Sequence, residues 1–195
     1  MGIWAEMTED FKTLLRLRTE PIAFRRLEKV EDLDHIPNVI RVKRGFTFCQ
    51  VPFMARVLGQ TVGITKEDPI GDRCTRLHGL RAATEKSMQI EAAMLSTTWF
   101  GSPEEALKQQ RETPRVPVGG AIVVAPLGKE KFEPEVVLIY ANPAQAMMIL
   151  CGLQKERYER FQFFFIGEGA CADSLAQCYT SGKPSLAIPC YGERA

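Results

Sequence analysis

Hydrophobic residues along the chain follow helical spacing in some segments and strand-like runs in others. Apolar positions from Trp4 to Leu17 recur at intervals of three and four, which predicts an amphipathic helix that ends before Pro21. The stretches 120–127 (GAIVVAPL) and 135–141 (EVVLIYA) are continuous apolar runs of the kind found in strands buried on both faces. Because the charged segment between them is short, we expect these two strands to be adjacent and antiparallel, or separated by a tight excursion.

The remaining segments continue the alternation of helices and strands. Ser102 and Asn142 are good N-cap residues, each followed by proline, and predict helices to about Glu112 and Tyr158. Shorter elements are expected as a helix over 52–58 and as strands over 21–27, 62–64, 163–166 and 186–188, with a solvated loop over 28–38. Residues 81–101 mix both periods. The pattern predicts a single α/β or α+β domain over residues 1–195, with a mixed sheet and flanking helices.

Composition and charge exclude several classes of function. The formal net charge of +1 over 195 residues gives no electrostatic basis for binding nucleic acid. The first twenty residues contain acids rather than the features of a signal peptide, and no apolar run is long enough to span a membrane. We therefore expect a cytoplasmic protein that binds neither membrane nor nucleic acid, whose six cysteines are reduced, metal-bound or catalytic rather than disulfide-bonded.

Three of the six cysteines lie between Phe161 and Arg194. The apolar run 163–166 leads into a turn with Gly167 and Gly169, and Cys171 stands where the next helix is expected to begin. Free N–H groups and the positive end of the helix dipole would stabilise a thiolate there. We expect both glycines to adopt positive φ and to bring backbone N–H groups close to the sulfur.

Two further cysteines of this stretch extend the expected site. Cys178 follows Cys171 by seven residues, about two helical turns, and would lie on the same face. The expected strand 186–188 would deliver Cys190 into the turn that follows it. The pattern therefore predicts a cysteine-rich site at one edge of the sheet.

The other cysteines have weaker sequence signals. Cys49 precedes the predicted helix 52–58, and it is equally well interpreted as a small buried residue in an aromatic pocket. Cys74 and His78 are four residues apart, a spacing that suits a shared metal or a thiolate–imidazolium pair, although we favour His78 as a packing or capping residue ahead of Gly79. Cys151 is expected to be structural, and the neighbouring Met147 and Met148 to fill the core.

Several short motifs together resemble the DUF169 family of uncharacterised bacterial and archaeal proteins, which are common in anaerobes. These are Phe48-Cys49, Cys74 before His78-Gly79-Leu80, Ala125-Pro126-Leu127, 142–147, Cys171 after the glycine turn, 180–184 and 190–194. The resemblance spans nearly the whole chain and implies that Cys49, Cys74, Cys171 and Cys190 are the family's motif cysteines, whereas Cys151 and Cys178 match none. Two departures are Arg76-Leu77-His78, where the family has small residues, and the end at Ala195, where other members continue into a further strand. The family supplies a set of cysteines and no activity.

Three functional hypotheses follow. The first is an iron–sulfur cluster, or alternatively zinc, held by Cys49, Cys74, Cys171 and Cys190, with Arg194 beside the cluster or another anionic ligand. The spacing lacks the CxxC pairs of zinc ribbons, and the anaerobes in which similar proteins occur favour iron–sulfur. The second is a metal-free thiol enzyme in which Cys171 is the nucleophile or redox thiol. The third is an accessory protein that binds a small molecule. A redox partner protein and a homo-oligomer are compatible with all three, and whether the protein is an enzyme stays open.

Overall fold

The strands of the protein form one mixed sheet. The computed structural model describes residues 2–166 and 169–189, and within them five strands lie in the order β2-β3-β4-β1-β5. Their bounds are Ile22–Leu27 (β1), Val39–Arg41 (β2), Thr61–Thr65 (β3), Ala121–Pro126 (β4) and Val136–Leu138 (β5). Strand β1 is antiparallel to both β4 and β5, β3 is antiparallel to β4, and β2 is parallel to β3. The predicted α/β class with a mixed sheet is confirmed.

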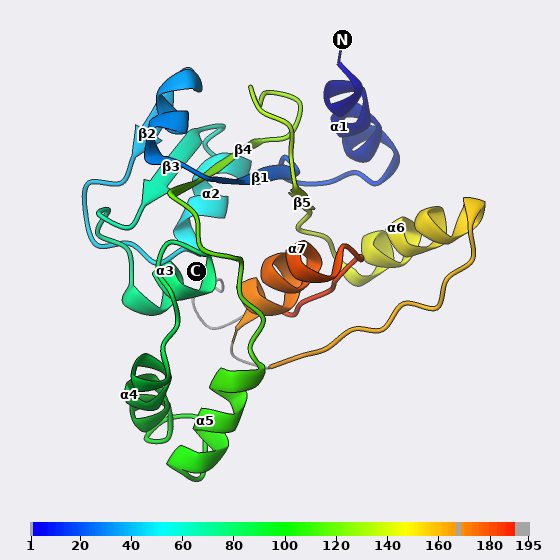
Figure 1. Ribbon diagram of the computed structural model, residues 1–195. Helices are drawn as coiled ribbons and strands as arrows, with labels where there is room; N and C mark the ends of the chain where they lie inside the picture. The colour runs from blue at the N-terminus through cyan, green and yellow to red at the C-terminus, as the bar shows by residue number, and fades with distance from the viewer. Residues whose placement is uncertain (1, 167–168, 190–195) are drawn as a thin grey trace.

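Helix α2 (Gln50–Arg56) packs on this sheet, whereas α4 (Glu85–Leu95) and α5 (Pro103–Glu112) pair with each other away from it (Figure 1). The other α-helices are α1 (Ile3–Leu14), α3 (Asp72–Leu77), α6 (Pro143–Glu156) and α7 (Gln177–Ser181). A 3-10 helix, η1 (Val30–His35), follows β1, and a π-helical turn, η2 (Ala172–Ala176), precedes α7. The predicted caps are present, since the side chains of Ser102 and Asn142 accept hydrogen bonds from the amides of Glu105 and Gln145.

The hydrophobic core lies on both faces of β4. On one face, Ile122 and Val124 pack with Val51 of α2 and Leu175 of η2. On the other, Ala121 and Val123 pack against η1, so that the segment 28–38 is not the solvated loop that was expected. Because every residue of β4 is buried, the predicted burial on both faces is confirmed for this strand. Burying one such aliphatic side chain contributes about 1.5–3 kcal/mol to the free energy of unfolding, so β4 contributes strongly to the stability of the fold.

Of the two expected arrangements of the apolar strands, the adjacent antiparallel pair is wrong, because β4 and β5 are not neighbours. Strand β1 lies between β4 and β5. The Glu135 N–H, just before β5, donates to the Phe24 carbonyl of β1. Strand β5 is consequently an edge strand, in which Val136 is buried while Val137 and Leu138 are only half-buried.

The expected strands over 163–166 and 186–188 do not form. Phe164, Phe165 and Ile188 are 62%, 50% and 71% exposed, and neither run pairs with a strand of the described sheet. The sheet edge at which the cysteine-rich site was expected therefore lacks both of its predicted strands. Similarly, Met147, Met148 and Cys151 are exposed on α6 rather than buried, as α6 projects away from the sheet (Figure 1).

Candidate functional site

Cys74 lies where the start of α2 meets α3. The backbone N–H of Phe48 donates to Cys74 Sγ over 3.4 Å, and Phe48 directly precedes Cys49, the N-cap residue of α2. The two segments are joined next to this contact by a parallel bridge between Phe46 and Ile70. Both thiols are half-buried. An N–H donor favours the charged form of the sulfur, so this junction supports a thiolate at Cys74.

His78 packs beneath this junction as the C-cap residue of α3. Its ring is fully buried and stacks on Phe48, with ring centroids 3.4 Å apart. Nδ1 lies 2.8 Å from the Cys74 carbonyl oxygen, which can only accept, so Nδ1 carries the proton. Burial lowers the pKa of His78 to about 4, against the opposing effect of the bond to Cys74. His78 is thus neutral at pH 7, which confirms the packing and capping role and argues against a thiolate–imidazolium pair.

Gly79 fixes the end of α3 against the segment that leads into β4. Its φ is +75°, and a Cβ at this position would lie 2.2 Å from the Pro117 carbonyl oxygen. Backbone bonds from Val116 to Leu77 (3.0 Å) and from Gly119 to Gly79 (2.8 Å) join the two segments. The helix that carries Cys74 is therefore held directly against the core of the sheet.

Cys171 is the N-cap residue of η2 and is half-buried, so its predicted place at the start of a helix is confirmed. The next two amides, of Ala172 and Asp173, already donate to the Gly169 carbonyl at 2.8 and 3.1 Å. Asp173 is 5% exposed, and its two carboxylate oxygens accept the Ile166 N–H at 3.1 and 3.0 Å. The amides that follow Cys171 are thus engaged in local hydrogen bonds, whereas Cys74 Sγ accepts one from Phe48.

The glycine turn before Cys171 differs from the expectation. Gly169 does not adopt positive φ, and its role is steric, because a Cβ there would lie 2.8 Å from Ile166 Cδ1. Gly167, Cys190 and Arg194 lie outside the described residues. Their predicted contributions to the site remain predictions.

Cys178 is displaced from the face on which it was expected. The intervening π turn accommodates one extra residue, so seven positions correspond to about six in an α-helix, a rotation of about 120° from Cys171. Burial raises the pKa of the Cys178 thiol. This sulfur, packed against the main core, is therefore poorly suited to act as a thiolate.

A complete metal site is not assembled within the residues that the structure describes. Cys74 and Cys171 both pack against the same core cluster, which also includes the buried Phe48. However, residues 2–166 and 169–189 contain no group of three or more His, Cys, Asp and Glu side chains placed to hold a metal ion. Cys49, Cys74 and Cys171 therefore do not by themselves form the predicted four-thiolate site.

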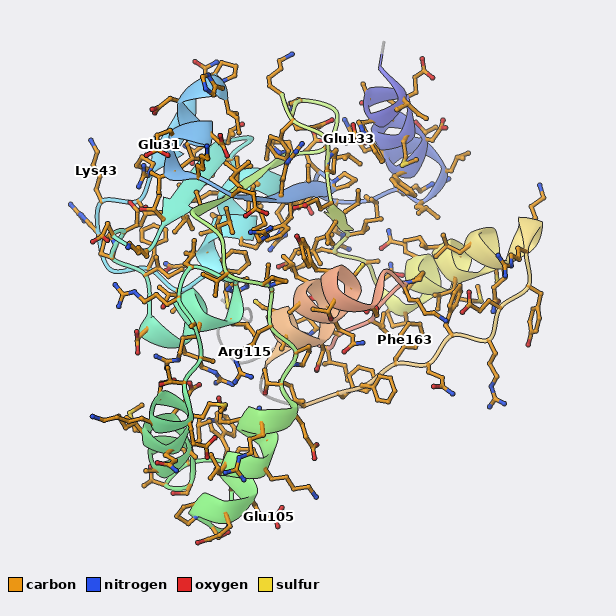
Figure 2. The ribbon with its side chains drawn as sticks, in the orientation of Figure 1. Glu31, Lys43, Glu105, Arg115, Glu133 and Phe163 are labelled. Carbon is orange, nitrogen blue, oxygen red and sulfur yellow. The ribbon has the colours of Figure 1, made fainter. Side chains whose placement is uncertain are left out.

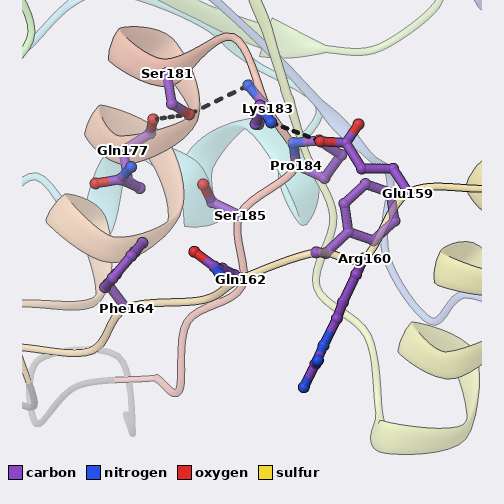
Figure 3. Close-up of a pocket in the computed structure, with 10 residues that line it drawn as sticks. Glu159, Arg160, Gln162, Phe164, Gln177, Ser181, Lys183, Pro184 and Ser185 are labelled. Atoms are coloured by element: carbon purple, nitrogen blue, oxygen red, sulfur yellow. Dashed lines mark hydrogen bonds and ion pairs between the residues drawn. The ribbon is translucent and has the colours of Figure 1, made fainter.

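Two cavities lie outside the cysteine junction. One, of about 360 Å³, lies between residues 159–164 and α7 (Figure 3). Within it, Lys183 pairs with Glu159 at 2.6 Å and its backbone N–H donates to Ser181 Oγ at 3.2 Å. No cysteine lines this cavity. The second is lined by four arginines from separate segments, which sequence reasoning missed because no local motif links them.

The fold and the junction define a mixed α/β protein with half-buried thiols packed around one core. The profile of the DUF169 family, described as "Uncharacterised ArCR, COG2043", matches residues 10–195, and the chain belongs to this family. A curated relative is Uncharacterized protein MJ0308 from Methanocaldococcus jannaschii, which is 32% identical over 75 residues. The match covers 38% of this chain and 32%, about a third, of that relative. No solved structure matches the chain, and no helix in the described ranges has the length and apolarity to cross a membrane.

Proposed function

We propose that this protein works through a reactive thiol, Cys74, at the junction of α2 and α3. The observation that carries the proposal is the hydrogen bond from the Phe48 N–H to Cys74 Sγ. A backbone donor held by packed segments stabilises the thiolate, which is the nucleophilic form of cysteine. Cys74 is half-buried as a residue, and the proposal requires that a substrate reach its sulfur.

Cys49 is the second thiol of the proposed site, because it follows the residue whose N–H contacts Cys74. The Cys74 thiolate would attack one sulfur of a disulfide in a small molecule or a redox partner protein, which releases one thiolate and leaves a mixed disulfide. Attack by the Cys49 thiolate on Cys74 Sγ would release the second substrate thiolate and leave a Cys49–Cys74 disulfide. The substrate disulfide gains two electrons and the cysteine pair loses two.

The rate of alkylation against pH tests the reactivity of Cys74. The wild-type protein is treated with iodoacetamide across a range of pH, and the modification of each cysteine peptide is followed by mass spectrometry. We expect the Cys74 profile to rise at lower pH than that of Cys151, the exposed reference thiol on α6. A Cys74 profile at the same or higher pH than that of Cys151 would contradict the proposal.

A second candidate function is an iron–sulfur cluster, with zinc as the alternative metal. The observations that favour it are that Cys74 and Cys171 pack against one core and that Cys74 Sγ accepts an N–H bond, a feature that tunes cluster thiolates. The cluster would require Cys49 and Cys190 as well. It would also require the described cysteines to approach one another more closely than they do here.

Anaerobic purification separates the two candidates. The cluster hypothesis expects iron and a broad visible absorption band, both lowered by serine at Cys49, Cys74, Cys171 or Cys190 because a hydroxyl is a poor soft-metal ligand. Cys151→Ser is the matched control and should keep the iron content of the wild type. A colourless, iron-free protein with a reactive Cys74 would eliminate the cluster and support the thiol function.

A further inference from the structure

The second cavity, of about 410 Å³, lies where α3, α4 and α5 meet the segment that leads into β4. We call it the arginine pocket, since four arginines line it, and its remaining lining includes the apolar residues Met88 and Val118. Figure 2 shows Arg115 between α3 and the α4–α5 pair. The four arginines are Arg76, Arg81, Arg111 and Arg115. A pocket of this volume is within the range that holds small molecules.

Arg115 has neutral hydrogen-bond partners. Its Nη1 donates to the Thr113 carbonyl (2.9 Å), and its Nη2 donates to the carbonyl and side-chain oxygens of Gln110 (2.7 and 3.3 Å). Within the described residues it forms no ion pair. Burial lowers the pKa of Arg115, and the charges of Arg73 and Arg76 lower it further against the effect of Glu91. An anion in the pocket would stabilise this charged guanidinium.

The other three arginines have acidic partners that leave an excess of positive charge. Asp72 pairs with Arg76 and, at 3.7 Å, with Arg81, while Glu85 pairs with Arg111. The third carboxylate, Glu91, lies 3.0 Å from Arg76 and is shared with Arg73. The four lining arginines therefore meet three carboxylates.

We propose that the arginine pocket binds a small molecule that carries a phosphate monoester beside an apolar group. A guanidinium presents several donors in a planar fork that matches phosphate oxygens, and it stays charged at any physiological pH. A phosphate dianion would balance the excess charge, while Met88 and the exposed Val118 would contact the apolar group. This site does not involve the thiols, so its test is independent of the proposed thiol function.

Isothermal titration with phenyl phosphate and inorganic phosphate tests the pocket. We expect saturable binding of phenyl phosphate, weakened about tenfold or more by Arg115→Gln because a charge-assisted hydrogen bond is lost. Arg81→Gln is a second variant, since Arg81 is exposed and its loss spares the fold, and it should weaken binding severalfold. Arg44→Gln removes an exposed arginine outside the pocket and should change the affinity less than about twofold. Equal affinity in all four proteins, or no saturable binding, would overturn the proposal.

Two further measurements check the chemistry of the ligand. Met88→Ala should weaken phenyl phosphate and leave inorganic phosphate unchanged, because only the former contacts the apolar wall. The affinity for phenyl phosphate should fall as the pH drops below the second phosphate pKa, near about 6. Benzoate, a monoanion of similar shape, should bind less tightly. Benzoate binding as tight as that of phenyl phosphate would overturn the assignment to a phosphate monoester.

Discussion

Acidification should destabilise this protein through one buried imidazole, and His78→Asn should remove much of that effect. His78 is fully buried beneath the α2–α3 junction, and its pKa falls from 6.5 to about 4 in the folded state. In the unfolded chain the ring binds a proton near pH 6.5, whereas in the folded protein it binds one only near pH 4. The unfolded state therefore holds more protons between these values, and stability falls as the pH decreases through this window.

The magnitude follows from the difference between the two pKa values. Each pKa unit corresponds to about 1.4 kcal/mol, so His78 should lower the free energy of unfolding by up to about 3 kcal/mol between pH 6.5 and pH 4. Above pH 6.5 the ring is neutral in both states and its contribution to stability does not change with pH. The side-chain amide of Asn can donate to the Cys74 carbonyl as Nδ1–H does, but it does not titrate.

Urea unfolding of the wild type and His78→Asn at several pH values measures the effect. The variant should be less stable near neutral pH, because it loses the stacking on Phe48. This deficit should shrink by about 2–3 kcal/mol as the pH falls from about 7 to about 4.5. Acidic residues titrate in both proteins and cancel in the difference. A deficit that is the same at every pH would refute the reasoning, since it would mean that His78 titrates alike in both states.

Two further changes test the packing around α3. Gly79→Ala should lower the free energy of unfolding by about 3 kcal/mol or more in urea titrations, because the new Cβ would clash with the Pro117 carbonyl. Gly59 also has positive φ, but nothing lies within 4 Å of a Cβ built there. Gly59→Ala should therefore lower the free energy of unfolding by only about 1 kcal/mol. Comparable losses at the two glycines would show that φ alone sets the cost. Glu91→Gln should destabilise by about 3 kcal/mol, since it leaves two α3 arginines without their buried partner, whereas Glu85→Gln, in an exposed ion pair, should cost less than about 1 kcal/mol. Equal unfolding midpoints for these two variants would contradict the assignment.

Local signals predicted the elements that carry them. The helices α5 and α6 begin at Ser102 and Asn142 because cap and proline signals act within a few residues. Helix α4 was not recognised, and its packing explains why. Its buried residues are Glu91 and Ala92, whereas Ile90 and Met94 are exposed, so that no apolar stripe marks the buried face.

Features that depend on distant contacts were beyond local reasoning. The apolar composition of 163–166 is typical of a strand, but a strand also needs a partner, and none of the strands in the described residues pairs with this run. At the candidate site, the sequence predicted that Cys49 and Cys171 lie at the starts of helices. It did not reveal that the Phe48 amide contacts Cys74, because the residues are 26 positions apart and meet only after α3 has docked.

The position of β1 between β4 and β5 has a consequence for how the chain folds during synthesis. Strand β1 leaves the ribosome early, yet its partners β4 and β5 emerge about a hundred residues later. Until then its backbone donors and acceptors and the buried side of Phe24 lack native partners. Closing so long a loop is slow, and an unpaired apolar strand is prone to aggregate. We therefore expect the nascent N-terminal half to need protection, for example by a chaperone, until β5 has been made.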